Sequence, residues 1–142
     1  MSTEPMSTEP HASKPVPTLP ACFGAYLAAW NEHDPVKMRR LVEVALTKDV
    51  AFTDPNHQIV GIDAFIGQLN DFRAAEGKAK LIPTSGVDMH HNLARYGWAV
   101  LRTDGTRFDG FDLVEIDPTQ GKIRRIDGFF GPLPEVGTAR IA

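Results

Sequence analysis

The chain has 142 residues, of which 42% are apolar and 23% charged, and this length fits one compact domain. Its formal net charge is -3, with acidic and basic residues dispersed along the chain, so it lacks the basic patch expected of a nucleic-acid-binding protein. Its apolar stretches are too short to span a membrane, and its single cysteine, Cys22, cannot form an intramolecular disulfide. We therefore expect a cytoplasmic protein with neither nucleic-acid nor membrane partners.

The first 18 residues differ in composition from the rest of the chain. They contain a tandem copy of MSTEP and are rich in proline, so they offer almost nothing to bury. We expect residues 1–18 to form a disordered tail and residues 19–142 to form a single domain.

Three helices are predicted in the first half of this domain. Residues 19–32 carry apolar side chains three and four positions apart, as on one face of a helix. Asp34 followed by Pro35 predicts the start of a second helix, because aspartate is a favourable N-cap and proline suits the first helical position. A strand over residues 49–53 and a turn separate this helical hairpin from a third helix that follows Gly61.

The second half of the domain predicts strands. They cover residues 80–83, 87–91, 94–102, 107–117 and 122–130. Two short turns, at Asp104-Gly105 and at 118–121, join the last three strands into a meander. Helices that precede an antiparallel meander indicate an α+β fold rather than a doubly wound sheet.

Asp112 is the acidic residue that the strand pattern places among apolar side chains. Alternate side chains of a strand share one face, so Asp112 lies with Phe108 and Val114. A carboxyl group buried without a cation has a raised pKa and can stay protonated as a hydrogen-bond donor. The alternative is that Asp112 pairs with Arg95 on the neighbouring strand. The register of that strand, which decides whether Arg95 or Trp98 faces Asp112, is left open by the sequence.

Two other residues suit proton transfer, although each also has a purely structural interpretation. Asp54 ends the first strand and precedes Pro55, and an aspartate in this position commonly caps its own turn. Tyr26 lies in the apolar stripe of the first helix, where a core tyrosine is common. His57 lies in the turn after Asp54, where we expect it to be exposed to solvent. Adjacent His90 and His91 point to opposite faces of a strand, so at most one of them reaches a pocket.

Three segments together resemble ketosteroid isomerase and its relatives in the nuclear transport factor 2-like superfamily, which includes the SnoaL-type polyketide cyclases. YLAAWNEHD, beginning at Tyr26, looks like the helix that carries the oxyanion-hole tyrosine. VAFTDPNHQIVG looks like the strand and turn with the general base, at Asp54. FDLVEIDPTQGKIRRIDGFFG resembles the strand in which a protonated aspartic acid occupies the position of Asp112. The resemblance spans about residues 20–134.

This resemblance implies a cone: a curved, mostly antiparallel sheet wrapped over three N-terminal helices. It also implies an isomerase or cyclase that needs no cofactor and moves a proton on a small hydrophobic carbonyl compound. In such an enzyme Asp54 is the base, and Tyr26 and Asp112 stabilise the negative oxygen that develops. Gly97 and Gly128 stand where the related limonene epoxide hydrolase has aspartates, which disfavours epoxide hydrolysis.

The residues expected to contact the substrate are Phe52, Phe65, Arg95, Trp98, Ile126, Phe130 and His91. No pair of potential ligands has a spacing that favours a metal site, so we expect none.

Two other functions remain open. The domain could be a binding protein that uses Arg95 to hold an anionic group, or a dimerisation module with a vestigial pocket. The strands over 94–102 and 107–117 carry apolar residues on both faces, which is more than one core uses. We therefore expect a homodimer that buries the outer face of the sheet.

Overall fold

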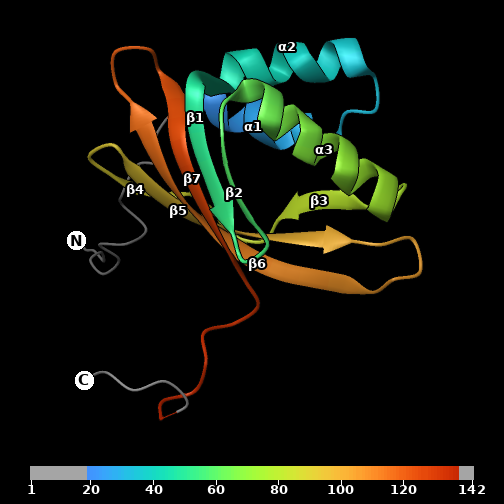
Figure 1. The fold of residues 1–142 in the computed structure, drawn as a ribbon. Helices are drawn as coiled ribbons and strands as arrows, with labels where there is room; N and C mark the ends of the chain where they lie inside the picture. Colours follow the sequence, from blue (N-terminus) through green and yellow to red (C-terminus); the bar gives the residue numbers. More distant parts are fainter. Residues whose placement is uncertain (1–18, 138–142) are drawn as a thin grey trace, which may run out of the picture.

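The computed structural model describes residues 19–137 and contains three helices and a seven-stranded curved sheet (Figure 1). The helices are α1 (Ala21–Asn31), α2 (Pro35–Ala45) and α3 (Ile62–Glu76). The strands are β1 (Leu46–Asp54), β2 (His57–Val60), β3 (Lys80–Pro83), β4 (Asp88–His90), β5 (Leu93–Leu101), β6 (Arg107–Asp117) and β7 (Lys122–Phe130). The predicted α+β class is confirmed, whereas the tail predicted over residues 1–18 lies outside the described residues.

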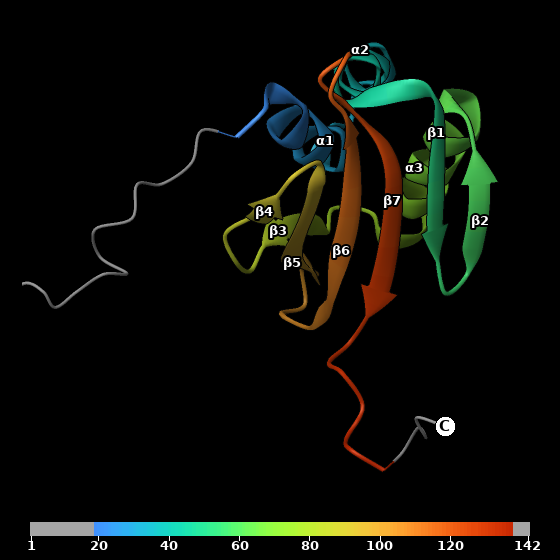
Figure 2. The same cartoon turned by 90° about the vertical axis from the view of Figure 1, so that its left-hand side faces the viewer.

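The order of the strands brings the two ends of the domain together. The sheet runs β2-β1-β7-β6-β5-β3, and β4 also pairs with β5. Neighbouring strands in the described part are antiparallel except β1 and β7, which are parallel. Figure 2 shows the long strands β5, β6 and β7 curving beside one another, with α1 and α3 on their concave side. Residues at the end of β1 therefore lie next to the end of β7.

The helices and strands begin close to the residues that the sequence predicts, with two differences. The Asp34 carboxylate caps α2, since its Oδ1 accepts from the backbone N–H of Val36 at 2.9 Å. β1 begins at Leu46, before the predicted residue 49, because α2 passes directly into the strand. β2 was not predicted: its four residues form a tight hairpin with β1 in which Asp54 is opposite His57.

The core lies between the helices and the concave face of the sheet. Its fully buried large side chains include Val42 of α2, Phe65 of α3, Val114 of β6 and Ile126 of β7. Burying such aliphatic and aromatic side chains is the main stabilising contribution to the fold. In residues 19–137, no helix has the length and apolar character needed to cross a bilayer.

Two polar side chains connect the ends of α1 and α3 to each other, to β3 and to the residues just before β3. The Asn31 amide at the end of α1 donates to the Leu81 carbonyl and accepts from the Leu81 N–H, both at 2.8 Å. The Arg73 guanidinium of α3 donates to the backbone carbonyls of Trp30, Gly77 and Ala79. These contacts fix the distance between the helices and β3, and thereby the width of the space between them.

Candidate functional site

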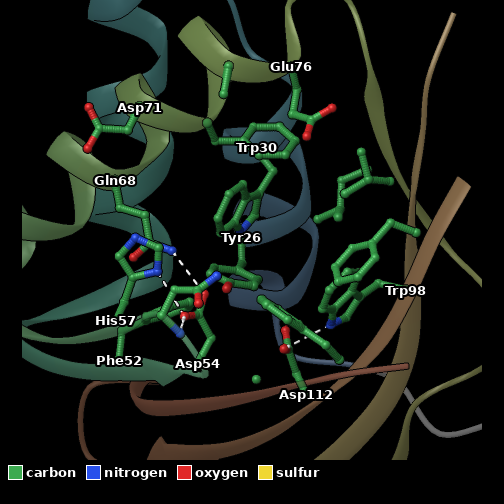
Figure 3. A pocket seen from close by; sticks show the side chains of 18 of the residues that line it. Tyr26, Trp30, Phe52, Asp54, His57, Gln68, Asp71, Glu76, Trp98 and Asp112 are labelled. Atoms are coloured by element: carbon green, nitrogen blue, oxygen red, sulfur yellow. Dashed lines mark hydrogen bonds and ion pairs between the residues drawn. The ribbon is translucent and has the colours of Figure 1, made fainter. Parts of the chain in front are cut away.

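A cavity of about 430 Å³ lies between the concave face of the sheet and helices α1 and α3 (Figure 3). Its aromatic lining residues are Tyr26, Trp30, Phe52, Phe72, Trp98, Phe108 and Phe130. Its acidic lining residues are Asp54, Asp71, Glu76 and Asp112. Largely apolar walls with a few polar groups are typical of a site for a small molecule.

Asp112 of β6 lies in the floor of this cavity and is only 6% exposed. Its Oδ1 accepts from Trp98 Nε1 at 2.9 Å, and its Oδ2 accepts from the Tyr96 hydroxyl at 3.0 Å. Burial raises the pKa of this carboxyl to about 6, with the charge of Asp54 adding to the rise, while the bonds from Trp98 and Tyr96 oppose it. Arg95 does not pair with Asp112, which resolves the alternative left open by the sequence.

Strand register explains why these particular side chains meet Asp112. Tyr96 is directly opposite Asp112, and Trp98 is opposite Gly110. A Cβ atom at Gly110 would lie 2.3 Å from the Trp98 ring, so only glycine lets the indole lie across β6. Because side chains alternate, Arg95 falls on the opposite, convex face of the sheet.

Tyr26 of α1 is buried and offers a neutral hydroxyl to the cavity. Its pKa lies well above the usual value of 10, because burial and the nearby charge of Asp112 disfavour the phenolate. A hydrogen bond with the Trp30 side chain only partly opposes this shift. The hydroxyl therefore stays protonated and can donate to a ligand.

Asp54 ends β1, and its side chain, which is 9% exposed, lies in the lining of the cavity. Its Oδ1 lies 2.8 Å from His57 Nδ1 and accepts from the Asn56 N–H at 2.8 Å. The Gln68 amide reaches Oδ2 only at 3.5 Å. With Oδ1 held by two partners, Oδ2 is the oxygen that is free to accept a proton from a ligand.

His57 is a site residue that the sequence analysis missed, as it also missed Trp30, Gln68, Glu76 and Arg102. His57 is half-buried, lines the cavity and contacts Asp54, where we expected a solvent-exposed turn residue. The sequence contained a signal for this contact, because Asp54 and His57 are separated by only two residues, Pro-Asn. A two-residue hairpin loop places the residues on either side of it opposite each other.

The structure brings together the three residues expected to be catalytic, since Tyr26, Asp54 and Asp112 all line one cavity. Phe52, Trp98 and Phe130, expected to contact the substrate, line it as well.

Phe65 and Ile126, also expected to contact the substrate, are fully buried in the core. The Phe65 ring instead supports the wall, 5.9 Å from the Tyr26 ring and 5.4 Å from the Phe52 ring, measured between centroids.

The expectations for Arg95 and His91 are corrected. Arg95 is exposed on the convex face, where its Nε lies 2.7 Å from Asp88 Oδ2. His91 leaves the strand, with a φ of 52°, and its ring packs against His90 outside the cavity. Neither side chain can reach a ligand held against Asp112.

The cavity contains one guanidinium group among the described residues, that of Arg102, the residue that follows β5. Glu76 of α3 binds it through two contacts, of 2.8 and 3.2 Å. This ion pair spans from helix to sheet and leaves no unpaired lysine or arginine in the described part of the lining. Within residues 19–137, no three His, Cys, Asp or Glu side chains are grouped so as to hold a metal ion.

A curved sheet folded over three helices, with an acidic and aromatic cavity between them, defines a class of small cavity-bearing α+β domains. Residues 23–126 match the SnoaL-like domain, and the chain belongs to this family. Its fold and family place it in the nuclear transport factor 2-like superfamily, as the sequence analysis predicted. The search of curated proteins found no match.

Three solved structures illustrate the likeness. A provisionally described isomerase of the SnoaL-like family from Agrobacterium tumefaciens is 27% identical, with a TM-score of 0.73 over 79% of this chain and 96% of that one. A provisionally described ketosteroid isomerase from Kribbella flavida is 18% identical, with a TM-score of 0.63 over 85% and 83% of the two chains. A provisionally described polyketide cyclase from Sinorhizobium meliloti is 16% identical, with a TM-score of 0.60 over 78% and 94%. The last two show the fold alone.

Proposed function

We propose that this protein is a cofactor-independent enzyme that transfers a proton on a small hydrophobic carbonyl compound, as an isomerase or cyclase. Membership of the SnoaL-like family supports a general isomerase-like, cyclase-like or ligand-binding role. The finer proposal is carried by one observation: Tyr26, Asp54 and Asp112 line the same apolar cavity.

The proposed chemistry gives each of these three groups one role. Asp54 Oδ2 removes a proton from the carbon next to the carbonyl group and returns it to another carbon. Tyr26 donates to the oxygen on which negative charge develops, in a cavity of low polarity where such a bond is strong. Asp112 adds a second donor when it is protonated. With its pKa at about 6, protonation at pH 7 costs about 1.4 kcal/mol, which a bound ligand oxygen can offset.

The test is an isomerisation assay with cyclohex-3-en-1-one, whose conversion to the conjugated ketone is followed by ultraviolet absorbance. Asp54→Asn should lower the rate by roughly 10² to 10⁴, as expected when a general base is lost. Asp112→Asn keeps a hydrogen-bond donor and should preserve much of the rate. Asp109→Asn, which removes a carboxylate from the convex face of β6, is the control and should leave the rate unchanged. A rate unaffected by Asp54→Asn would exclude Asp54 as the base.

A second proposal is a non-catalytic binding protein that uses the same cavity. The observation that favours it is the hydrogen-bonding of Asp112, whose two oxygens are already engaged by Trp98 and Tyr96. Arg95 has no part in it, because that side chain lies on the convex face. Binding of carbonyl compounds without any proton exchange in D₂O would favour this function.

A further inference from the structure

Two carboxylates flank one glycine in the floor of the cavity. In the sheet, β7 lies between β1 and β6, so Gly128 of β7 separates Asp54 from Asp112. A Cβ atom at Gly128 would lie 3.2 Å from Asp112 Oδ1 and 3.5 Å from Asp54 Cβ. The missing side chain therefore leaves a recess above Gly128, with a carboxylate on each side of it.

Neither carboxylate is paired with a lysine or arginine. Asp112 is held by the uncharged Trp98 and Tyr96 side chains, and Asp54 by His57 and a backbone N–H. Arg102, the guanidinium group described in the lining, is bound by Glu76. Two carboxylates this poorly solvated repel an anion and attract a cation much more strongly than they would in water.

Apart from the Tyr26 hydroxyl, which can donate as well as accept, the hydrogen-bonding groups left open around the recess are mainly acceptors. Asp54 Oδ2 has only the long contact to Gln68, and the Trp98 and Tyr96 donors are already used by Asp112. Gln68 is only 8% exposed and lines the cavity near Asp54, and its buried Oε1 has no partner among the described residues. An ammonium group has donors and no acceptor, so it complements this set.

The walls above the recess suit the rest of such a ligand. Tyr26, Trp30 and Trp98 present aromatic rings to the cavity (Figure 3), and Phe130 also belongs to its lining. Aromatic faces attract cations and also cover apolar groups. The same cavity therefore accommodates both the charged and the apolar part of one ligand.

We propose that the cavity selects hydrophobic ligands that carry an ammonium group, held over Gly128 between the Asp54 and Asp112 carboxylates, and that it rejects carboxylate ligands. The inference names the ligand class of the cavity used in the proposed function, and it rests on that cavity being a ligand site rather than on turnover.

The test compares three probes that differ only in their polar group: 3-phenylpropylamine, 3-phenylpropan-1-ol and 3-phenylpropionate, at pH 7.5. Both tryptophans of the chain line the cavity, so quenching of tryptophan fluorescence reports binding, and calorimetry checks the affinities. The amine should bind at least tenfold more tightly than the alcohol, and the carboxylate at least tenfold more weakly than the alcohol.

Variants separate this site from general attraction to an acidic protein. Asp54→Asn and Asp112→Asn should each reduce the advantage of the amine over the alcohol at least threefold, and the double variant should abolish it. Asp109→Asn removes the same charge from the convex face and should leave the advantage unchanged. Thermal melting of each variant establishes that it is folded.

An alcohol that binds as tightly as the amine, or an amine that does not bind, overturns the proposal. So does an amine advantage that survives in both single variants, or that is lost equally in Asp109→Asn. Proton transfer on cyclohexenone without amine selectivity would contradict this inference alone. Amine selectivity without proton transfer would contradict the proposed function alone.

Discussion

At the scale of single residues, Asp112 shows how burial and hydrogen bonding compete at one carboxyl group. Trp98 and Tyr96 satisfy both of its oxygens, and both donors favour the ionised form. Burial outweighs them and raises the pKa to about 6, because no cation accompanies the carboxylate. The ionised form is therefore held in the fold at a cost in stability.

Because the ionised carboxylate destabilises the fold, the effect of Asp112→Asn on stability should depend on pH. A carboxyl whose pKa rises from 3.8 to about 6 on folding favours the folded state fully below pH 4, and this contribution is lost as the pH rises through 6. At about 1.36 kcal/mol per pKa unit, the loss amounts to roughly 3 kcal/mol at most. The stability of Asp112→Asn relative to wild type should therefore increase between pH 4 and pH 7.5. Urea unfolding at both pH values measures it, and a pH-independent difference would contradict the raised pKa.

One added methyl group at Gly110 should have a large effect on the stability of the fold. Its Cβ would lie 2.3 Å from the Trp98 ring and 2.5 Å from the backbone oxygen of Phe129, which cannot move aside. Gly110→Ala should lower the free energy of unfolding by about 1 to 3 kcal/mol and change the Trp98 fluorescence. The matched control is Gly24→Ala on the exposed side of α1, where nothing lies within 4 Å of the added atom. This control should stabilise the protein by about 0.4 to 1 kcal/mol.

At the scale of elements, the contact between α1 and β3 depends on the side-chain amide of Asn31. Asn31 satisfies both backbone groups of Leu81 on an edge strand, which protects that edge and fixes the cavity wall. Asn31→Ala should lower the free energy of unfolding by about 1 to 3 kcal/mol, because a partly buried N–H and C=O lose their partners. Asn92→Ala in the exposed turn before β5 should change it by less than about 0.5 kcal/mol. Equal stability of the two variants would show that water replaces the amide.

At the scale of the whole molecule, we propose that the convex face of the sheet forms a homodimer. Leu113 is 43% and Phe129 45% exposed there, and the Phe129 ring is stacked on Phe111 at 5.1 Å. Apolar side chains gathered on one exposed face are typical of an interface. Sedimentation should give a mass near twice 15.6 kDa at micromolar concentration, with or without residues 1–18.

A substitution on this face tests the proposed interface. Leu113→Glu should give a monomer, because it places a charge at the centre of the contact. The matched control is Leu133→Glu, an exposed leucine beyond the end of the sheet, which should remain dimeric. A wild-type protein that sediments as a monomer would contradict the proposal.

Much of the fold was predictable because its signals are local. Helical spacing marked α1, the Asp34-Pro35 pair marked the start of α2, and the turns marked the meander β5 to β7. β2 was missed because four residues give too little alternation to distinguish a strand from a turn.

The sequence by itself determined that this is an α+β domain, that Asp112 shares a face with apolar residues, and that Tyr26 lies on the buried stripe of a helix. Periodicity and turn chemistry act over a few residues, so they can be read without a structure. Only the tertiary structure decided that Arg95 faces outward and that Asp54 and Asp112 lie on either side of Gly128. These positions depend on strand register and on the parallel pairing of β1 with β7, which join segments far apart in the chain. No local pattern encodes such pairing, because it is set by which surfaces are buried together when the sheet closes over the helices.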